Sequence, residues 1–247
     1  MTDVTIDVHR PTPEAEWAAA DLEHLAPFAP GPPATVVVVA PHPDDEVLGV
    51  AGLVQGLHRA GHRIEVVAVT DGEASHPGSR AMRPPILAAV RRIEAAAARR
   101  ALGLHGCPTV RLGLPDGAVA DHEDRLTEVL TDRLDAHAMV LATWRADGHP
   151  DHEAAGRAAA AAATASGARL VEYPVWAWSW AHPGDARLPW ASASTVRLDP
   201  EARRAKHHAI RAFFTQIEPL GPAAADGPVL PEAVLAHHRR PYEVLFG

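Results

Sequence analysis

The sequence is poor in cysteine, in basic residues and in long apolar runs. Its 247 residues include one cysteine, Cys107, which excludes an internal disulfide and a thiolate-rich zinc site. Lys and Arg total 23 against 31 Asp and Glu, a formal net charge of -8, so the basic surface typical of nucleic-acid or anionic-lipid binding is missing. No stretch approaches the roughly 20 apolar residues of a membrane span. We therefore expect no nucleic-acid and no membrane partner, and any metal site must use His and carboxylate ligands.

The N-terminal segment MTDVTIDVHRPTPEAEW also lacks the basic and apolar regions of a secretory signal, so a cytoplasmic protein is the expectation. A hydrophobic content of 47% over 247 residues is ample for one large α/β domain or two small ones. Because the chain shows no internal repeat and no linker that demands a second domain, we expect a single domain.

Apolar periodicity alternates between strand-like and helix-like segments. Short apolar runs at 34–40, 63–70, 108–114 and 138–144 predict strands, and helical periodicity predicts helices at 46–60, 85–103, 121–136 and 151–167. After Leu170 the pattern weakens, and we expect a strand with a Pro-rich loop, a strand at 195–198 and a helix from 200 to about 214. This order predicts an α/β fold, Rossmann-like, with three α/β/α layers and a mostly parallel sheet.

The first candidate site follows four valines in VVVVAPHPDDEVLG, residues 36–49. In a doubly wound sheet, ligands bind beyond the carboxyl ends of the strands, and this turn lies at such an end. His42 and Asp45 are three positions apart and can converge on one metal ion while Asp44 points elsewhere in the cleft. The prolines limit the conformations of the turn, which favours a fixed ligand geometry.

A second cluster, RADGHPDHEAAG, has the same placement after the strand at 138–144. A catalytic zinc site uses about three protein ligands and keeps one position for water. His42, Asp45 and His152 form such a set, with Asp44 left as a base and His149 as a polar donor. The alternative for either cluster alone is a solvated loop with an Asp at the helix start, and the pairing of two such clusters argues against it.

The motifs APHPDDEVLG and GHPDH resemble the two signature motifs of the PIG-L or LmbE-like deacetylases, zinc-dependent enzymes that remove acyl groups from N-acylated amino sugars and related conjugates. RRIEAAAARRALG resembles the R-x-x-E helix of that family, LGLPDG its third-strand turn, and KHHAIRAFFTQ its closing helix, with Thr215 in place of the usual Ser before Gln216. The resemblance runs from Val36 to Gln216. It implies one deacetylase domain over 1–247, with a core at about 34–216 and extensions at 1–33 and 217–247.

Carried over residue by residue, the resemblance implies one Zn²⁺ per chain, with another divalent metal as the alternative. The implied metal ligands are His42, Asp45 and His152. The implied general base is Asp44, and the implied oxyanion-stabilising histidine is His149. In that mechanism His149, if protonated, would stabilise the tetrahedral oxyanion. Asp151 is expected to orient a ligand histidine, and Glu46 to act structurally at the helix start.

Each residue that we consider for substrate binding has two interpretations. Asp116 in LPDG is placed to hold sugar hydroxyls or to form an ordinary Asp-Gly turn. Arg80 and Arg83 lie in a loop on the same edge of the sheet and either reach the substrate or are solvated. Trp176 and Trp178, together with Trp180, would share one face of a strand, where they stack on a sugar or form a hydrophobic patch.

The histidine pairs 207–208 and 237–238 have no carboxylate at ligand spacing, so we interpret them as surface or helix-C-terminal histidines. A nucleotide-dependent enzyme is not supported, because G-x-G-x-x-G and G-x-x-x-x-G-K-[ST] are absent, and a serine hydrolase lacks its G-x-S-x-G.

The expected partner is a small N-acylated amino sugar or conjugate. An acylated aminoglycoside or glycopeptide intermediate of secondary metabolism, such as antibiotic biosynthesis, is one candidate, and an amidase substrate of the mycothiol type is another. A relative that only binds a sugar conjugate would be expected to lose Asp44 or a metal ligand, and this chain keeps all of them.

Overall fold

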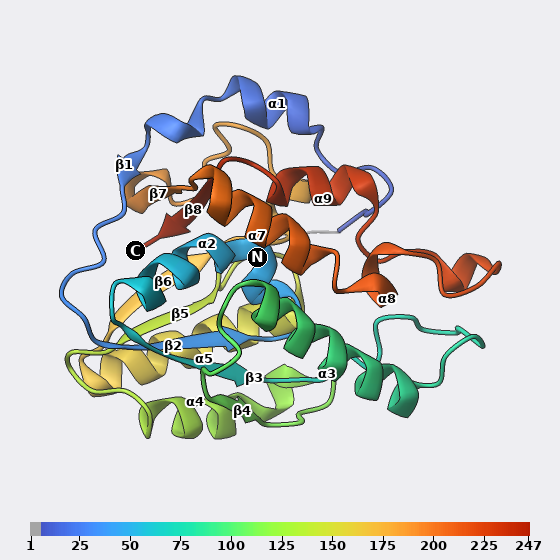
Figure 1. Ribbon diagram of the computed structural model, residues 1–247, viewed down its shortest axis with the longest axis horizontal. Helices are drawn as coiled ribbons and strands as arrows, with labels where there is room; N and C mark the ends of the chain where they lie inside the picture. The colour runs from blue at the N-terminus through green and yellow to red at the C-terminus, as the bar shows by residue number, and fades with distance from the viewer. Residues whose placement is uncertain (1–5) are drawn as a thin grey trace.

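The computed structural model describes residues 6–247, so the first five residues of the expected N-terminal extension lie outside the described residues. One eight-stranded sheet, in the order β1-β7-β8-β6-β5-β2-β3-β4, forms the middle layer (Figure 1). Its strands are β1 (Ala26–Pro27), β2 (Thr35–Ala40), β3 (Arg63–Ala68), β4 (Thr109–Arg111), β5 (Met139–Thr143), β6 (Arg169–Tyr173), β7 (Ala193–Arg197) and β8 (Tyr242–Phe246). Among these described strands, β8 alone is antiparallel to its neighbours β6 and β7.

Helices cover both faces of the sheet, which confirms the predicted α/β class with a mostly parallel sheet (Figure 1). Val36 and Val38 pack with α2, α3 and α7, whereas Val37 and Val39 pack with α4 and α5 on the opposite face. Both faces of β2 are therefore buried, which explains its continuous valine run. The helices are α1 (Glu14–Ala19), α2 (Asp45–Arg59), α3 (Pro84–Ala101), α4 (Glu123–Thr131), α5 (Pro150–Ser166), α6 (Ala177–Trp180), α7 (Pro200–Ile210), α8 (Phe214–Ile217) and α9 (Glu232–His238).

Helix α5 lies unusually close to β5. A Cβ atom at Gly156 would lie 2.6 Å from the carbonyl oxygen of Thr143, so only glycine permits this approach. The Thr143 hydroxyl also donates a hydrogen bond to the carbonyl oxygen of His152, at 3.0 Å. These contacts fix the first turns of α5 against the carboxyl end of β5.

Helix α2 is interrupted at Val50, whose backbone angles are not helical (φ -139°, ψ 19°). The N–H groups of Gly52 and Leu53 donate instead to the carboxylate of Glu243 on β8, at 2.9 and 2.8 Å. The break therefore separates a short first turn, which begins at Asp45, from the longer part of the helix.

Two predicted elements are wrong in detail. The segment with the three alternating tryptophans is not a strand, because β6 ends before Pro174 and the following residues form α6. The helix expected from 200 to about 214 ends at Ile210, and α8 follows. The N–H of Thr215 donates to the side chain of Glu94 on α3 rather than to the preceding helical turn.

Both terminal extensions contribute to the sheet. β1 from the N-terminal extension pairs with β7, and β8 from the C-terminal extension lies between β7 and β6. Within residues 6–247, no helix has the length and apolar composition needed to cross a membrane.

Candidate functional site

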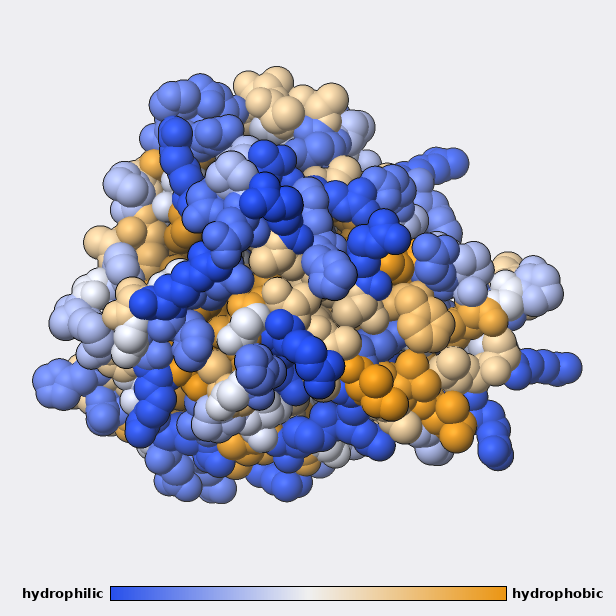
Figure 2. All heavy atoms as spheres, viewed as in Figure 1, coloured by the Kyte–Doolittle hydropathy of each residue, from blue (hydrophilic) through white to orange (hydrophobic). Residues whose placement is uncertain are grey.

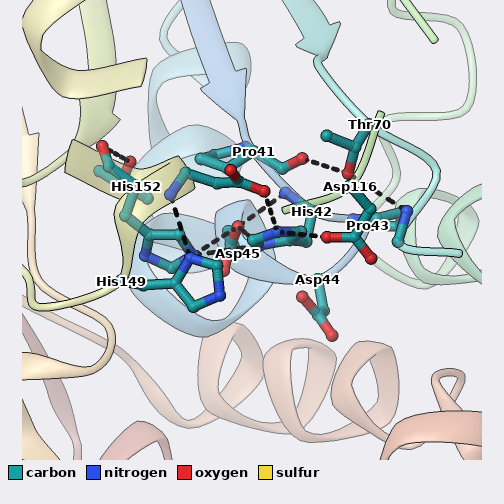
Figure 3. A network of polar contacts seen from close by, with 12 residues as sticks. Pro41, His42, Pro43, Asp44, Asp45, Thr70, Asp116, His149 and His152 are labelled. Carbon is teal, nitrogen blue, oxygen red and sulfur yellow. Dashed lines mark hydrogen bonds and ion pairs between the residues drawn. The ribbon is translucent and has the colours of Figure 1, made fainter. Parts of the chain in front are cut away.

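Two turns at one edge of the sheet bring the predicted residues together. Strands β2 and β5 are parallel neighbours, so their carboxyl ends lie side by side. The turn after β2 carries His42 and leads into α2, while the turn after β5 leads into α5, where His149 is the N-cap. Figure 3 shows the side chains of both turns pointing toward one another.

Three buried side chains converge on one point. Nδ1 of His42 lies 3.2 Å from Nε2 of His152, and each of these nitrogens lies 3.2 Å from Oδ2 of Asp45. Burial alone raises the pKa of Asp45, but the charges and hydrogen bonds of His152 and His42 hold it well below its usual value. The result is a carboxylate facing two imidazole nitrogens.

The outer nitrogens of both histidines face carboxylates. Nδ1 of His152 lies 2.8 Å from Oδ2 of Asp147. Nε2 of His42 lies 3.2 Å from Oδ2 of Asp151 and 3.1 Å from Oδ1 of Asp116. A carboxylate can only accept, so each histidine carries a proton on its outer nitrogen. Burial lowers the pKa of both rings, but the surrounding carboxylates raise that of His42 well above its usual value and that of His152 to about 9. A metal bound at the inner nitrogens would therefore replace a proton there.

Three inner donor atoms in mutual contact fit a metal ion. His and carboxylate ligands backed by outer carboxylates are the usual environment of zinc. Two overlapping groups also have ligand atoms within 4.8 Å of one another: His42, His149, His152 and His42, Asp116, Asp151. The site is thus a candidate metal centre.

Asp44 points away from this cluster (Figure 3). Its φ of 146° is rare for a residue other than glycine, and this strained backbone separates its side chain from that of Asp45. Oδ2 of Asp44 accepts a hydrogen bond from the buried guanidinium of Arg91 on α3, at 2.9 Å. Burial raises the pKa of Asp44 to about 7, although the charge of Arg91 opposes the shift. Asp44 therefore has the surroundings of a general base.

Arg91 was not among the residues predicted for the site. It also donates to the carbonyl oxygens of Pro43, at 2.9 Å, and Gly72, at 3.1 Å. A Cβ at Gly72 would lie 1.8 Å from the Arg91 side chain, so glycine makes room for the guanidinium. The R-x-x-E motif was the feature of the sequence that could have indicated Arg91. Glu94, one turn later in this motif, accepts hydrogen bonds from the N–H and the hydroxyl of Thr215 at 2.9 and 2.7 Å. Thr215, which stands where the resemblance expects Ser, thus uses its hydroxyl to hydrogen-bond Glu94.

His149 is placed to act as a neutral donor. Its Nδ1 accepts a hydrogen bond from the N–H of Asp151, at 3.2 Å, so the ring proton belongs on Nε2. Burial, followed by the charges of His152 and His42, lowers the pKa of His149 to about 3. This favours the neutral ring, so the condition of a protonated His149 is not met and the ring donates through Nε2–H.

The two residues expected to support the site have different surroundings. Asp151 is buried and contacts His42, and it also accepts the N–H groups of Gly117 and Val119 at 2.7 and 3.1 Å. Glu46 is buried in the first turn of α2, where burial raises its pKa, and within residues 6–247 its Oε2 has no hydrogen-bond partner.

A cavity of about 280 Å³ opens beside the cluster. Half of the predicted residues line it, together with groups from the C-terminal part of the chain. The lining residues are His42, Asp44, Asp45, Leu48, Ala74, Ser75, Arg91, Asp116, Gly117, His149, Pro150, Trp176, Gln216, Val229 and Leu230.

The residues suggested for substrate binding separate into two groups. Asp116 and Trp176 line the cavity. Trp178 is buried instead against Trp17, with ring centroids 4.9 Å apart, and does not line it. Arg80 and Arg83 are both exposed, and neither lines it. The sequence indicates that Arg80 and Arg83 lie in a loop near the site, but it does not indicate whether their side chains point into the cavity.

The histidine pairs lie in the last turns of α7 and α9, as the helix-C-terminal interpretation predicts. His237 and His238 are nevertheless buried, each 3% exposed, so the surface interpretation is wrong for that pair.

The face of the molecule in Figure 2 is largely hydrophilic, with apolar residues gathered mainly in its hollows and toward one side.

Comparison with known proteins places these features in context. The model of the family PIG-L: GlcNAc-PI de-N-acetylase matches residues 37–163. The structure is similar to the deacetylase of the antimicrobial A40926 pseudoaglycone, with 26% identity, coverage of 85% of this chain and 95% of that chain, and a TM-score of 0.63. The comparison with curated proteins finds no match.

Two further deacetylases share the fold. The N,N'-diacetylchitobiose deacetylase from Pyrococcus horikoshii, complexed with an inhibitor, is 22% identical with a TM-score of 0.56, over 72% of this chain and 68% of that chain. A zinc-inhibited form of teicoplanin deacetylase is 20% identical with a TM-score of 0.60, over 74% of this chain and 85% of that chain.

Proposed function

The chain belongs to the PIG-L family of de-N-acetylases, and from this premise we propose that it is a zinc-dependent hydrolase that removes an acyl group from the amide nitrogen of an amino sugar or glycoconjugate. The acyl group that we propose is acetyl. The observation that carries the proposal is the contact of His42, Asp45 and His152 at 3.2 Å, beside a cavity that is lined by His42, Asp45 and the separate carboxylate of Asp44.

Among the three overlapping groups, we assign the metal to His42, Asp45 and His152. In the group with Asp116 and Asp151, the His42 nitrogen that faces the carboxylates is its protonated Nε2. Those carboxylates also accept backbone N–H groups, from Ala74 and from Gly117. His149 uses its Nδ1 to accept the Asp151 N–H.

When bound, zinc supplies a Lewis acid that makes water more acidic and polarises the amide carbonyl. Asp44 takes the proton of the attacking water at Oδ1, because Arg91 occupies its Oδ2. Nε2–H of His149 donates to the oxyanion that develops on the carbonyl oxygen. The proton held by Asp44 then passes to the leaving amine, which returns the carboxylate to its starting state.

The walls of the cavity fit a sugar with an apolar attachment. Ser75, Asp116 and Gln216 offer polar groups for hydroxyls, while Trp176 and Leu230 offer apolar surface. The similarity to a pseudoaglycone deacetylase, which extends over 95% of that chain, supports a conjugated amino sugar, and with it a role in secondary metabolism such as antibiotic biosynthesis.

The test combines metal content with amine release from a panel of N-acyl amino sugars, N-acylated glycopeptides and mycothiol-type conjugates. We expect the purified chain to contain about one zinc and to release amine from at least one amino-sugar conjugate. His152→Ala should lose most of the metal and all detectable activity, because three ligands cannot spare one. The exposed His208→Ala is the matched control and should keep both. Full zinc in the His152 variant, or a zinc-loaded wild type inert on the whole panel, would refute the proposal.

A further inference from the structure

Asp147 is a fully buried carboxylate in the turn between β5 and α5, with 0% exposure. Its Oδ2 faces Nδ1 of His152 at 2.8 Å and accepts the N–H of Trp176 at 2.9 Å. Its Oδ1 accepts the N–H groups of Val175 and Ala177, each at 2.9 Å. One side chain thus joins an imidazole of the metal cluster to three consecutive backbone groups of another segment.

We propose that Asp147 is a positioning residue that holds the proton of His152 on Nδ1 and, with the same carboxylate, fixes the cavity wall at Trp176. The proposal rests on the metal site of the proposed function. It adds a device that ties metal binding to the shape of the substrate cavity.

The first part follows from the hydrogen-bond capacity of the carboxylate. A carboxylate oxygen accepts, so Nδ1 of His152 carries the hydrogen in their 2.8 Å contact. Nε2 is then the nitrogen that a metal can take, and it faces Nδ1 of His42 and Oδ2 of Asp45. In the opposite tautomer a hydrogen would occupy the point where these atoms meet.

The second part concerns the wall. Residues 175–177 lead into the short helix α6, and their N–H groups would be unpaired without Asp147. The carbonyl oxygen of Asp147 also accepts from the indole N–H of Trp180, at 2.7 Å. Trp176, which is 8% exposed, lines the cavity from this segment. A displacement of Asp147 therefore moves His152 and Trp176 together.

Two substitutions at Asp147 separate this role from a merely structural one. In Asp147→Asn, the amide oxygen pairs best with the N–H groups of Val175 and Ala177, because the reverse orientation sets the NH₂ against two donors. The NH₂ then faces His152, whose proton must move to Nε2. Asp147→Ala leaves the tautomer free but removes every hydrogen bond of the side chain.

We expect Asp147→Asn to weaken zinc affinity by about 10-fold to 100-fold, at least as much as Asp147→Ala does. The unfolding temperature of the metal-free protein should fall less for Asn than for Ala, because Asn keeps the side-chain volume and two hydrogen bonds. Zinc affinity is measured by competition with a chelator. Asp132→Asn, at an exposed position after α4, is the control and should leave both quantities unchanged. If Asp147→Asn binds zinc more tightly than Asp147→Ala, the proposal is wrong.

A measurement on the zinc-loaded wild type covers the case in which the variants do not fold. The ¹⁵N shifts of the His152 ring, assigned by comparison with His152→Gln, should show the ring proton on Nδ1 and the metal on Nε2, and a proton on Nε2 would overturn the proposal. Neither zinc affinity nor the tautomer requires substrate. A chain that binds zinc through His152 but releases no amine would therefore contradict the proposed function alone.

Discussion

Asp44 and Asp45 are adjacent in the chain, but the structure gives their carboxylates different partners. Asp45 faces two imidazoles, whereas Asp44 turns toward Arg91 through a backbone conformation that is costly for any residue with a side chain. Two carboxylates on one zinc would also reduce the acidity of its water. This separation supports different roles for the neighbours.

Substitution of each aspartate by asparagine tests the separation. Asp44→Asn should keep zinc near one equivalent and still bind substrate, but lose about 10²-fold to 10⁴-fold in kcat, the range of general acid-base catalysis. Asp45→Asn should lose zinc first. The measurement is zinc content and turnover of both variants in one buffer, with folding checked by circular dichroism. An empty Asp44 variant beside a loaded Asp45 variant would exchange the two roles.

At the scale of elements, the break in α2 is stabilised from a distant part of the chain. The carboxylate of Glu243 accepts the N–H groups of Gly52 and Leu53 after the break and also pairs with the buried Lys206, at 2.8 Å. Nδ1 of His238 donates to the carbonyl oxygen of Leu48, at 3.3 Å, just before the break. The C-terminal segment thereby completes the helix that begins at Asp45.

Glu243→Gln should lower the free energy of unfolding by about 3 kcal/mol, because it leaves the charge of Lys206 buried and unpaired. Urea unfolding monitored by circular dichroism measures the change. The control is Glu201→Gln, which removes an exposed ion pair with Arg59 and should cost less than about 1 kcal/mol. Equal unfolding midpoints for the two variants would show that the buried pair does not support the break.

At the scale of the whole molecule, the site depends on two separate parts of the sequence. The region matched by the family, residues 37–163, contains both histidine-aspartate turns. The cavity walls at Trp176, Gln216 and Leu230 come from beyond it. Because β8 lies within the sheet between β6 and β7, the C-terminal segment belongs to the core and not to its surface.

The buried His238 makes the stability of this assembly dependent on pH. Burial, followed by the charges of Lys206 and His237, holds its pKa well below the ordinary value of 6.5, so the folded chain keeps it neutral. Below about pH 6.5 the unfolded chain binds a proton there that the folded chain does not. The free energy of unfolding should therefore decrease as the pH falls below that value, by up to about 1.4 kcal/mol per pH unit from this group.

The test compares metal-free wild type with His238→Asn, whose amide retains a donor for the carbonyl of Leu48. Urea unfolding between about pH 7 and 5 should give a smaller pH dependence for the variant, by about one proton. Parallel curves for the two proteins would assign the acid sensitivity to other groups.

The sequence alone determined the architecture and the identity of the two turns. Continuous valines predict a strand buried on both faces, and residues that follow neighbouring parallel strands must meet at one edge of the sheet. His42, Asp45 and His152 could therefore be grouped from their positions in the chain, and so could the alternation of strands and helices up to β5. These features depend on local periodicity and on short spacings, which are visible in the chain itself.

Only the tertiary structure decided which distant side chains complete the site. Arg91 reaches Asp44 from α3, Asp147 joins His152 to the segment at 175–177, and Glu243 enters the break in α2. The alternating tryptophans suggested a strand. However, Pro174 lacks an N–H, and the N–H groups of the next three residues donate to the side chain of Asp147, so a short helix forms there instead. Hydrogen bonds between residues far apart in the chain overrode the local pattern there, because a buried N–H must be paired wherever its acceptor lies.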